Sequence, residues 1–249
     1  MSRLRARCPD CRANTAVALD GDYQCHTCGR EFGAGLVRVA RAWGRGGREM
    51  EEASLMEIPW PEAALVDEDT LEQQNAALAR QLPDRPLVLG GCCCAHVGAV
   101  RELARRHGRV ALVWIDAHGD LNTPATSLSG DAWGMPLRML IDAGDVAARD
   151  VTLIGARNLD PEEQEFIASR GLRTGLGELG DHVYVALDCD VLDPDAIDVF
   201  MPEPGGFSLE ELERLLASIP RPVGAGFTGL VPSDRNELVL ARLGHALGL

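Results

Sequence analysis

Lysine is absent from this chain of 249 residues, and all 24 of its basic residues are arginines. A Schiff-base cofactor site needs a lysine amine, as does a phosphate-binding P-loop, so both kinds of site are excluded. No run of 18 apolar residues occurs, and we expect no membrane-spanning helix. The first residues lead into cysteines without an apolar segment, so we also expect no secretory signal and a cytoplasmic location.

The charge of the chain is acidic and unevenly spread. The formal net charge of −14 argues against general nucleic-acid binding, because phosphate binding needs positive charge. Residues 1–48 nevertheless hold nine arginines and four acidic residues, a charge of +5, while the remaining 201 residues carry −19. Such a split indicates two modules. The length suits one large α/β domain, alone or with a small appendage.

Eight cysteines are present, and in a cytosolic chain metal ligands or buried thiols are expected rather than disulfides. Two Cys-x-x-Cys pairs with 13 residues between them comprise Cys8, Cys11, Cys25 and Cys28. Two such pairs let four thiolates converge on one zinc ion, and Gly21-Asp22 between them suits a hairpin turn. Two redox-active pairs are the alternative, but neither has the βαβ context of such motifs. The pattern therefore predicts a zinc ribbon.

A zinc site with all four positions filled by protein is structural rather than catalytic. We therefore expect the basic ribbon to dock onto nucleic acid, a partner protein or the acidic body of its own chain, and we favour the last two. The predicted organisation is a zinc ribbon over residues 1–33, a linker and leading helix over 34–83, and an α/β domain over 84–249.

Apolar runs alternate with helical patterns along the body of the chain. Apolar runs without polar alternation are typical of strands buried on both faces of a parallel sheet. The predicted strands are Pro86–Leu89, Val110–Ile115, Val151–Ile154, Val183–Leu187 and Val223–Phe227. The predicted helices are Thr70–Leu82, Ala95–His107, Pro161–Ser169, Ser208–Ser218 and Asn236–Ala246. In such folds ligands bind beyond the carboxyl ends of the strands.

Two predicted strands end in clusters of metal-ligating side chains. Asp116, His118 and Asp120 follow one strand at alternate positions, which points all three to one side. Asp188 and Asp190 follow another strand in the same way. Alone, each cluster could be a helix cap or a packed polar residue. Together, five such ligands suffice for two divalent cations, which lower the pKa of a shared water molecule.

Four stretches match signature motifs of a known enzyme family. Residues 116–124 (Asp-Ala-His-Gly-Asp-Leu-Asn-Thr-Pro) and 188–194 (Asp-Cys-Asp-Val-Leu-Asp-Pro) resemble its two metal motifs. Residues 129–136 resemble a substrate-side segment, and residues 204–208 resemble part of its Pro-x-x-Gly-Gly stretch. The chain thus resembles the arginase/agmatinase (ureohydrolase) superfamily over roughly residues 84–249, with the ribbon outside the resemblance.

The resemblance implies a three-layer α/β/α fold with a mainly parallel sheet and a binuclear manganese centre, whose bridging hydroxide attacks a guanidinium carbon. By position, Asp116 and Asp188 would bridge the two metals. Asp120 would complete the first site and hold the hydroxide, while His118 and Asp190 would complete the second. Asp120 and His118 are accordingly the expected catalytic residues.

Three further positions resemble those at which the family contacts its substrate. Asn122 and Ser129 match residues that touch the α-amino-acid end of the substrate in arginases. Asp160 matches an acidic residue that receives a substrate amine. Trp133 also lies in the substrate-side segment.

The first departure from the family concerns a metal ligand. The family has Gly-Gly-Asp-His where this chain has Gly-Gly-Cys-Cys-Cys over residues 90–94, which puts Cys93 at the position of the ligating histidine. A thiolate is softer than imidazole and favours zinc or iron over manganese. A branch resembling N-hydroxyarginine hydrolases also has cysteine there. The alternatives are that the three cysteines are simply small buried residues, or that His96 compensates, which its direction along the helix disfavours.

Two more departures concern the substrate. Trp133 replaces a histidine that shuttles protons in arginases, and indole is neither acid nor base. Gly229 stands nearest to the position of a glutamate that meets the guanidinium, and Glu203, Asp234 and Glu237 are possible substitutes. The segment between Asp160 and Asp188 is also short for the family, which implies trimmed substrate loops. A modified guanidine or an amidine therefore fits better than plain arginine.

We accordingly expect an arginase-like metallohydrolase that attacks a C–N carbon of a small guanidino, N-hydroxyguanidino or amidine compound. Its expected cofactors are two divalent cations, Mn²⁺ first and Zn²⁺ or Fe²⁺ because of Cys93, and one structural Zn²⁺. The family also suggests a homo-oligomer. The alternative is a non-catalytic regulatory protein that binds metal or ligand and docks a partner through its ribbon. Related deacetylases fit less well, since they use one zinc.

Overall fold

Seven strands form the main sheet of the protein, whose computed structural model describes all residues except 1–4, 7, 9, 12, 14, 20–21 and 33–34. In chain order they are β5 (Gly35–Val39), β6 (Glu62–Val66), β7 (Pro86–Gly90), β8 (Ala111–Ile115), β9 (Val151–Ile154), β10 (Val183–Asp188) and β11 (Gly224–Thr228). Their order across the sheet is β6-β5-β7-β11-β10-β8-β9. Every neighbouring pair is parallel. All carboxyl ends therefore lie along one edge.

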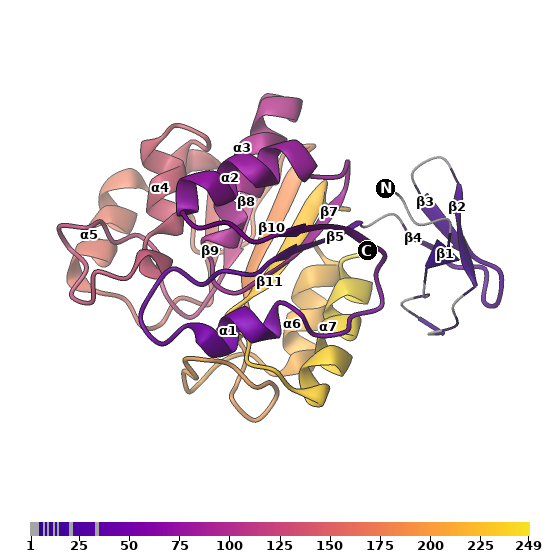
Figure 1. The fold of residues 1–249 in the computed structure, drawn as a ribbon. Helices are drawn as coiled ribbons and strands as arrows, with labels where there is room; N and C mark the ends of the chain where they lie inside the picture. The colour runs from indigo at the N-terminus through magenta and orange to yellow at the C-terminus, as the bar shows by residue number, and fades with distance from the viewer. Residues whose placement is uncertain are drawn as a thin grey trace.

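Helices cover both faces of this sheet (Figure 1). They are α1 (Arg48–Ala53), α2 (Leu71–Gln81), α3 (Ala95–His107), α4 (Pro136–Asp142), α5 (Pro161–Arg170), α6 (Leu209–Ala217) and α7 (Asp234–Ala246). Leu112 and Trp114 of β8 pack in the core beneath α2–α5, whereas Val113 and Ile115 pack in the core beneath α6 and α7. This alternation between two buried faces confirms the three-layer α/β/α fold.

All five predicted strands and all five predicted helices are present, with ends that differ by at most two residues. Local chemistry fixes several of these ends. The Thr70 side chain accepts a hydrogen bond from the Gln73 N–H and caps α2. Ser208 and Glu211 form the expected capping box at the start of α6. The predictions succeed where a long periodic pattern meets a capping residue.

The segment 34–83 is more than the predicted linker and leading helix. It contributes β5 and β6 to the sheet, where β5 lies between β6 and β7. It also contains α1 before the predicted helix α2. Leu36, Val37 and Val39 are completely buried, but this short apolar run is flanked by glycines and arginines that suggested irregular chain. The sheet therefore begins about 50 residues before the first predicted strand.

The cysteines of the predicted ribbon come together beside a small antiparallel sheet of β1 (Arg5–Ala6), β2 (Ala16–Leu19), β3 (Asp22–Cys25) and β4 (Glu31–Phe32). Their four sulfur atoms lie within 4.8 Å of one another. Contacts of 3.5 Å join Cys8 to Cys28 and Cys11 to Cys25, one cysteine from each pair. Such crossed contacts suit one shared ion better than two redox pairs. Gly21 of the expected turn lies outside the described residues.

The ribbon contacts the C-terminal end of its own chain (Figure 1). The Arg30 guanidinium donates to the Leu249 carbonyl oxygen at 2.6 Å and also contacts His245 of α7. Asp10 Oδ1 lies 3.0 Å from His245 Nδ1. These contacts join the ribbon to the body of its own chain, which is one of the three docking surfaces expected for it.

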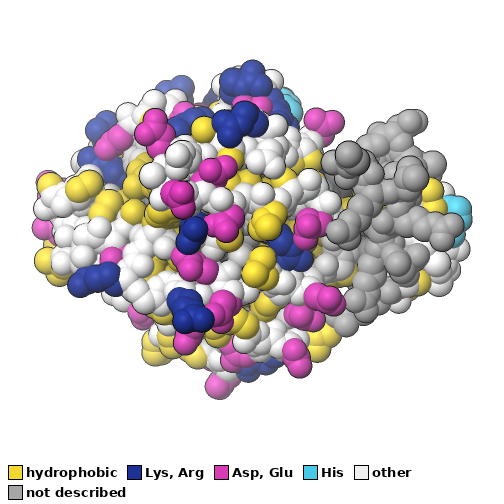
Figure 2. Space-filling model, in the orientation of Figure 1, with side chains coloured by type: hydrophobic (Ala, Val, Ile, Leu, Met, Phe, Trp, Pro, Cys, Tyr) yellow, Lys and Arg dark blue, Asp and Glu magenta, His cyan; other side chains and the backbone are white. Residues whose placement is uncertain are grey.

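The body surface mixes charges of both signs. On the face shown in Figure 2, acidic and basic side chains are interspersed. Among the described helices, none combines the length and apolar character that crossing a bilayer requires.

A substitution at Gly206 of the Gly-Gly motif can test how tightly the loop after β10 is packed. A Cβ atom added there would lie 2.4 Å from the Val191 carbonyl oxygen, so the loop backbone would have to move. We expect Gly206→Ala to lower the free energy of unfolding by about 1–3 kcal/mol in urea titrations. Gly175→Ala, with no atom within 4 Å of the added Cβ, is the matched control. Equal effects of the two substitutions would contradict this packing.

Candidate metal centre

The two predicted ligand clusters meet because their strands are neighbours. β8 and β10 pair in parallel, with Ile115 opposite Leu187, so the residues that follow these two positions leave the sheet together. Asp116 and Asp188 are consequently adjacent at the carboxyl edge and are both buried. The topology thus brings all five predicted ligands to one place.

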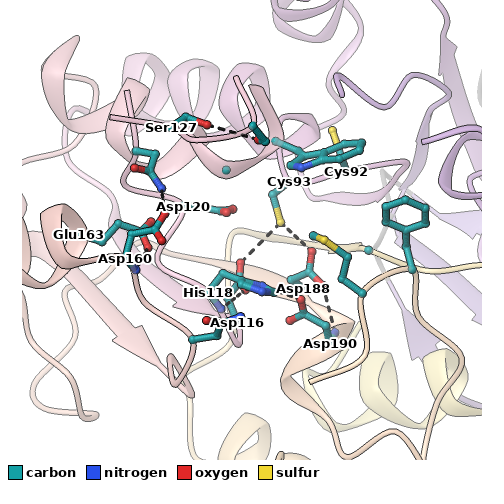
Figure 3. Close-up of a pocket in the computed structure, with 18 of the residues that line it drawn as sticks. Cys92, Cys93, Asp116, His118, Asp120, Ser127, Asp160, Glu163, Asp188 and Asp190 are labelled. Atoms are coloured by element: carbon teal, nitrogen blue, oxygen red, sulfur yellow. Dashed lines mark hydrogen bonds and ion pairs between the residues drawn. The ribbon is translucent and has the colours of Figure 1, made fainter. Parts of the chain in front are cut away.

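Backbone N–H groups turn the aspartates inward. The His118 N–H donates to Asp116 Oδ1 at 2.7 Å, and the Asp190 N–H donates to Asp188 Oδ1 at 3.0 Å. Each bond joins residues two positions apart and closes a small turn of the kind that aspartate favours. The Ala117 N–H donates across to Asp190 Oδ1 at 3.0 Å and ties the two strand ends together. The free carboxylate edges therefore face the same cavity (Figure 3).

Two groups of potential ligand atoms share one aspartate. In each group all ligand atoms lie within 4.8 Å of one another. One group is Cys93, Asp116 and Asp120, and the other is Asp116, His118 and Asp190. Asp188 adjoins the first group, since its Oδ2 lies 3.0 Å from Cys93 Sγ. This division parallels the two metal sites expected from the resemblance, with Asp116 in the bridging position.

Cys93 lies among the carboxylates, and His96 does not. The Cys93 sulfur points toward Asp188 and toward Asp116 Oδ2, which is 3.8 Å away (Figure 3). His96 is completely buried between the Tyr184 hydroxyl (3.1 Å) and the Thr228 hydroxyl (3.3 Å). It therefore cannot replace Cys93 as a ligand. The Thr228 hydroxyl also contacts Cys93 Sγ at 3.0 Å and so links His96 to the site.

Burial and mutual repulsion perturb the titration of these groups. Burial, followed by the charge of Asp190, raises the pKa of Asp188 to about 7. Burial and then the charges of Asp116 and Asp188 hold the pKa of Asp120 well above its usual range. Burial lowers the pKa of His118, but hydrogen bonds to Asp116 and Asp190 outweigh it and raise this pKa to about 12. Without cations, the cluster thus retains protons that metal binding would displace.

The donors present fit two divalent cations. Asp120 Oδ2 is buried and has no hydrogen-bond partner among the described residues, which is costly for a carboxylate oxygen unless a cation meets it. The Asp120 backbone also has a φ of 53°, a left-handed conformation uncommon outside glycine and typical of strained functional sites. Carboxylate oxygens, one imidazole and one thiolate form a donor set suited to first-row transition metals.

A cavity of about 260 Å³ opens above these ligands. All four residues expected to contact a substrate line it, namely Asn122, Ser129, Trp133 and Asp160. The Asn122 amide donates to Asp160 Oδ2 at 2.8 Å, so these two side chains form one polar wall. The cavity thus brings together the predicted body metal ligands and substrate-side residues, whereas the four ribbon cysteines form a separate cluster.

Several lining residues were not predicted from the sequence. Among the described residues they are Met50, Cys92, Ser127, Leu128, Gly134, Asn158, Glu163, Phe200 and Met201. Glu163 accepts hydrogen bonds from the N–H groups of Leu121 and Asp160 and holds the loop after β8 against α5. Its position three residues after Asp160 is a capping-box signal that could have identified it. The apolar residues come from the short helix α1 and from irregular segments, which give no comparable signal.

The departure from the family at Gly229 has a structural explanation. An added Cβ at Gly229 would lie 2.1 Å from Asp188 Oδ1, and the φ there is +76°, so this backbone leaves no room for a glutamate. Of the three acidic substitutes considered, only Glu203 contacts the site, with Oε1 3.5 Å from His118 Nε2. Asp234 and Glu237 lie in the first turn of α7, where Glu237 accepts from the Glu57 N–H.

The electrostatics predict a pH dependence for the metal-free protein. The pKa of Asp188 is about 7 in the folded state and close to 4 when unfolded, so the folded state holds a proton that the unfolded chain releases between these values. Stability must then fall as the pH rises from about 4 to 7. Asp188→Asn should remove part of this decline, by at most about 4 kcal/mol at pH 8.

Urea titrations of chelator-treated wild type and Asp188→Asn between pH 5 and 8 measure the effect. Both proteins lose any ribbon metal alike, so the difference between them reports the site. Adding a divalent cation to the wild type should abolish its decline, because the cation replaces the protons. Parallel pH profiles for the two proteins would show that folding does not raise the pKa of Asp188.

The amino-acid sequence was compared with known protein families and with characterised proteins. The Arginase family matches residues 15–238, which extends the resemblance well before residue 84 and takes in β5 and β6. An arginase from Bacillus caldovelox is 36% identical over 220 residues, which cover 71% of this chain and 74% of that protein.

Solved structures share the fold. The crystal structure of an arginase from Bacillus subtilis matches with a TM-score of 0.75 and 24% identity, over 86% of this chain and 97% of that one. A formimidoylglutamase from Bacillus subtilis matches with a TM-score of 0.67 and 18% identity, over 86% of each chain. At these identities the two structures show the fold alone. With the family match over most of its length, this chain belongs to the arginase family of C–N hydrolases.

Proposed function

We propose that the protein is a binuclear metal-dependent hydrolase of the ureohydrolase type, which cleaves a C–N bond of a small guanidino, N-hydroxyguanidino or amidine compound. The observation that carries this proposal is the pair of ligand groups that share Asp116 on the floor of the cavity. Family membership supports the reaction class, and the site residues support two cations.

The proposed cofactors follow from the donor set. Asp116 and Asp188 would bridge two divalent cations, Cys93 and Asp120 would complete the first site, and His118 and Asp190 would complete the second. The family resemblance favours Mn²⁺ at both sites, whereas the Cys93 thiolate shifts the metal preference of the first site toward Zn²⁺ or Fe²⁺. A structural Zn²⁺ held by the four ribbon cysteines accounts for their convergence.

The proposed chemistry is a hydrolysis. When bound, the two cations lower the pKa of a shared water and supply a nucleophile at neutral pH. The water oxygen bonds to the guanidinium or amidinium carbon, and the bond from that carbon to one nitrogen breaks. The nitrogen takes a proton and leaves as an amine or ammonia, while the carbon leaves as a urea or an amide.

Asp120 is the proposed acid–base group of the chain. Its Oδ2 has no protein partner among the described residues and faces the cavity, so it can take the proton of the water and return it to the leaving nitrogen. Trp133 cannot share this role, because indole neither gains nor loses a proton in this pH range. Glu203 lies beside His118 Nε2 and would orient that imidazole toward its metal.

A non-catalytic regulatory protein is the second candidate. It is favoured by the Trp133 and Gly229 positions, where the chain lacks the proton shuttle and the guanidinium partner implied by the family resemblance. In that case the cavity would bind metal or a ligand without turnover, and the ribbon would dock a partner protein. A homo-oligomer and a cytoplasmic location belong equally to both candidates.

Metal analysis joined to a turnover assay separates the two candidates. The purified protein should contain about three metal ions per chain, two in the body and one in the ribbon. Loaded with Mn²⁺ or Zn²⁺, it should release urea, hydroxyurea or an amide from arginine, N-hydroxyarginine, agmatine, guanidino acids or amidines.

Asp120→Asn should lower turnover by about 10²–10⁴-fold, because the carboxylate can no longer accept a proton. Asp142→Asn, which changes a surface carboxylate on α4 that pairs with Arg138, is the matched control and should retain activity. Two bound body metals without turnover on any of these compounds would leave the regulatory candidate.

A further inference from the structure

The cavity has an acidic floor and an apolar mouth. Asp116, Asp120 and Asp190 are buried at the floor, whereas the apolar lining residues are Met50, Leu128, Trp133, Phe200 and Met201. Leu128 is 95% exposed and Met201 is 41% exposed. Only three other large hydrophobic side chains are so exposed among the described residues. Exposed apolar groups gathered at a cavity mouth indicate a surface that a ligand covers.

Trp133 is fixed as one wall of this mouth. An added Cβ at Gly44 would lie 2.4 Å from the indole ring, and one at Gly47 would lie 3.1 Å from it. The ring is therefore pressed against backbone that only glycine can provide. Phe200 meets it edge to face, with the ring centroids 5.6 Å apart and an interplanar angle of 62°. This arrangement makes a rigid aromatic wall of the kind that binds flat apolar groups.

Among the described residues that line the cavity, no arginine is available to pair with a negatively charged substrate group. Its described lining residues include six carboxylates and no arginine, and two dications would balance only four of these charges. Arg45 donates to the Ser129 carbonyl oxygen at 3.0 Å and forms an ion pair with Asp131 at 3.4 Å. Arg157 donates to the Asp190 carbonyl oxygen at 2.9 Å. A cation is therefore attracted to this cavity, and a carboxylate is repelled from it.

The polar wall does not reverse this preference. Asn122 stands where the family resemblance expects contact with an amino-acid substrate, but its amide nitrogen donates to Asp160 and its oxygen accepts from Thr126. Both oxygens of Glu163 are held by backbone N–H groups. These groups already have hydrogen-bond partners within the protein, so a substrate carboxylate gains little from them.

We propose that the substrate is a guanidinium or amidinium cation that bears no carboxylate and carries a flat apolar substituent. The cationic head lies over the acidic floor, and the substituent lies in the mouth against Trp133 and Phe200, with Leu128 and Met201 covering it. This assignment rests on the proposed function for the reaction, but its binding preference can be measured without turnover.

Matched ligand pairs that differ by one carboxylate test the charge preference. The pairs are phenylguanidine with 4-guanidinobenzoate, and agmatine with arginine. Calorimetric titration of the metal-loaded full chain should show phenylguanidine binding at least about tenfold more tightly than 4-guanidinobenzoate, because the added carboxylate meets only like charge. Agmatine should likewise bind more tightly than arginine. Equal or tighter binding of the carboxylated partner in both pairs overturns the proposal.

The apolar mouth is tested by the ratio of the affinities for phenylguanidine and methylguanidine. Trp133→Ala should lower this ratio by about three- to tenfold, since the aromatic contact is lost. Leu128→Ser should lower it by a smaller factor. Leu238→Ser, which changes a 55% exposed leucine on α7 away from the cavity, is the matched control and should leave the ratio unchanged. An unchanged ratio in Trp133→Ala overturns the proposed position of the substituent.

Turnover of the same compounds separates this proposal from the one on which it rests. Binding in the expected order without hydrolysis of any compound, with both metals present, contradicts the proposed reaction and supports the binding preference. Hydrolysis with arginine as the preferred substrate supports the reaction and contradicts the substrate class. Failure of all five compounds to bind the loaded chain overturns the substrate class as well.

Discussion

Repulsion among buried carboxylates is the constraint on which this molecule depends. The parallel pairing of β8 and β10 places Asp116, Asp120, Asp188 and Asp190 together at one sheet edge, where all four are buried. Such charges persist only when they are neutralised, by protons at low pH or by cations at neutral pH. The backbone N–H groups of Ala117, His118 and Asp190 orient them but cannot balance them. The fold therefore requires positive charge beside these carboxylates. The cavity above them consequently favours cationic ligands.

The fold was largely predictable because its inner strands are uniform apolar runs. Val183–Leu187 and Val110–Ile115 are buried on both faces, and their lengths and glycine or aspartate ends leave little ambiguity. The outer strands were not predictable in this way. β6 alternates half-buried and exposed positions before its buried last residue, and β5 is one short run within an arginine- and glycine-rich stretch. Neither gives a signal until its neighbour in the sheet is in place.

The candidate site divides along similar lines. Asp116, His118, Asp188 and Asp190 were predictable because they directly follow strands whose neighbours the topology fixes. The mouth was not, because Leu128 and Phe200 come from separate irregular segments and Met50 comes from the short helix α1, and these meet only in the folded chain. The sequence showed that Trp133 and Gly229 depart from the family. Only the structure gives the physical reasons. The indole ring packs directly against glycine backbone, and Asp188 fills the space that a side chain at position 229 would need.

The central claim is that this acidic floor holds two cations between the ends of β8 and β10. A crystal structure of the Mn²⁺- or Zn²⁺-loaded protein with anomalous diffraction tests it most directly. The account predicts two anomalous peaks, roughly 3.5–4 Å apart as in other two-metal sites, on either side of Asp116, with the Cys93 sulfur among the ligands of one. A single peak in the cavity, or none beyond the one held by the ribbon cysteines, would contradict it.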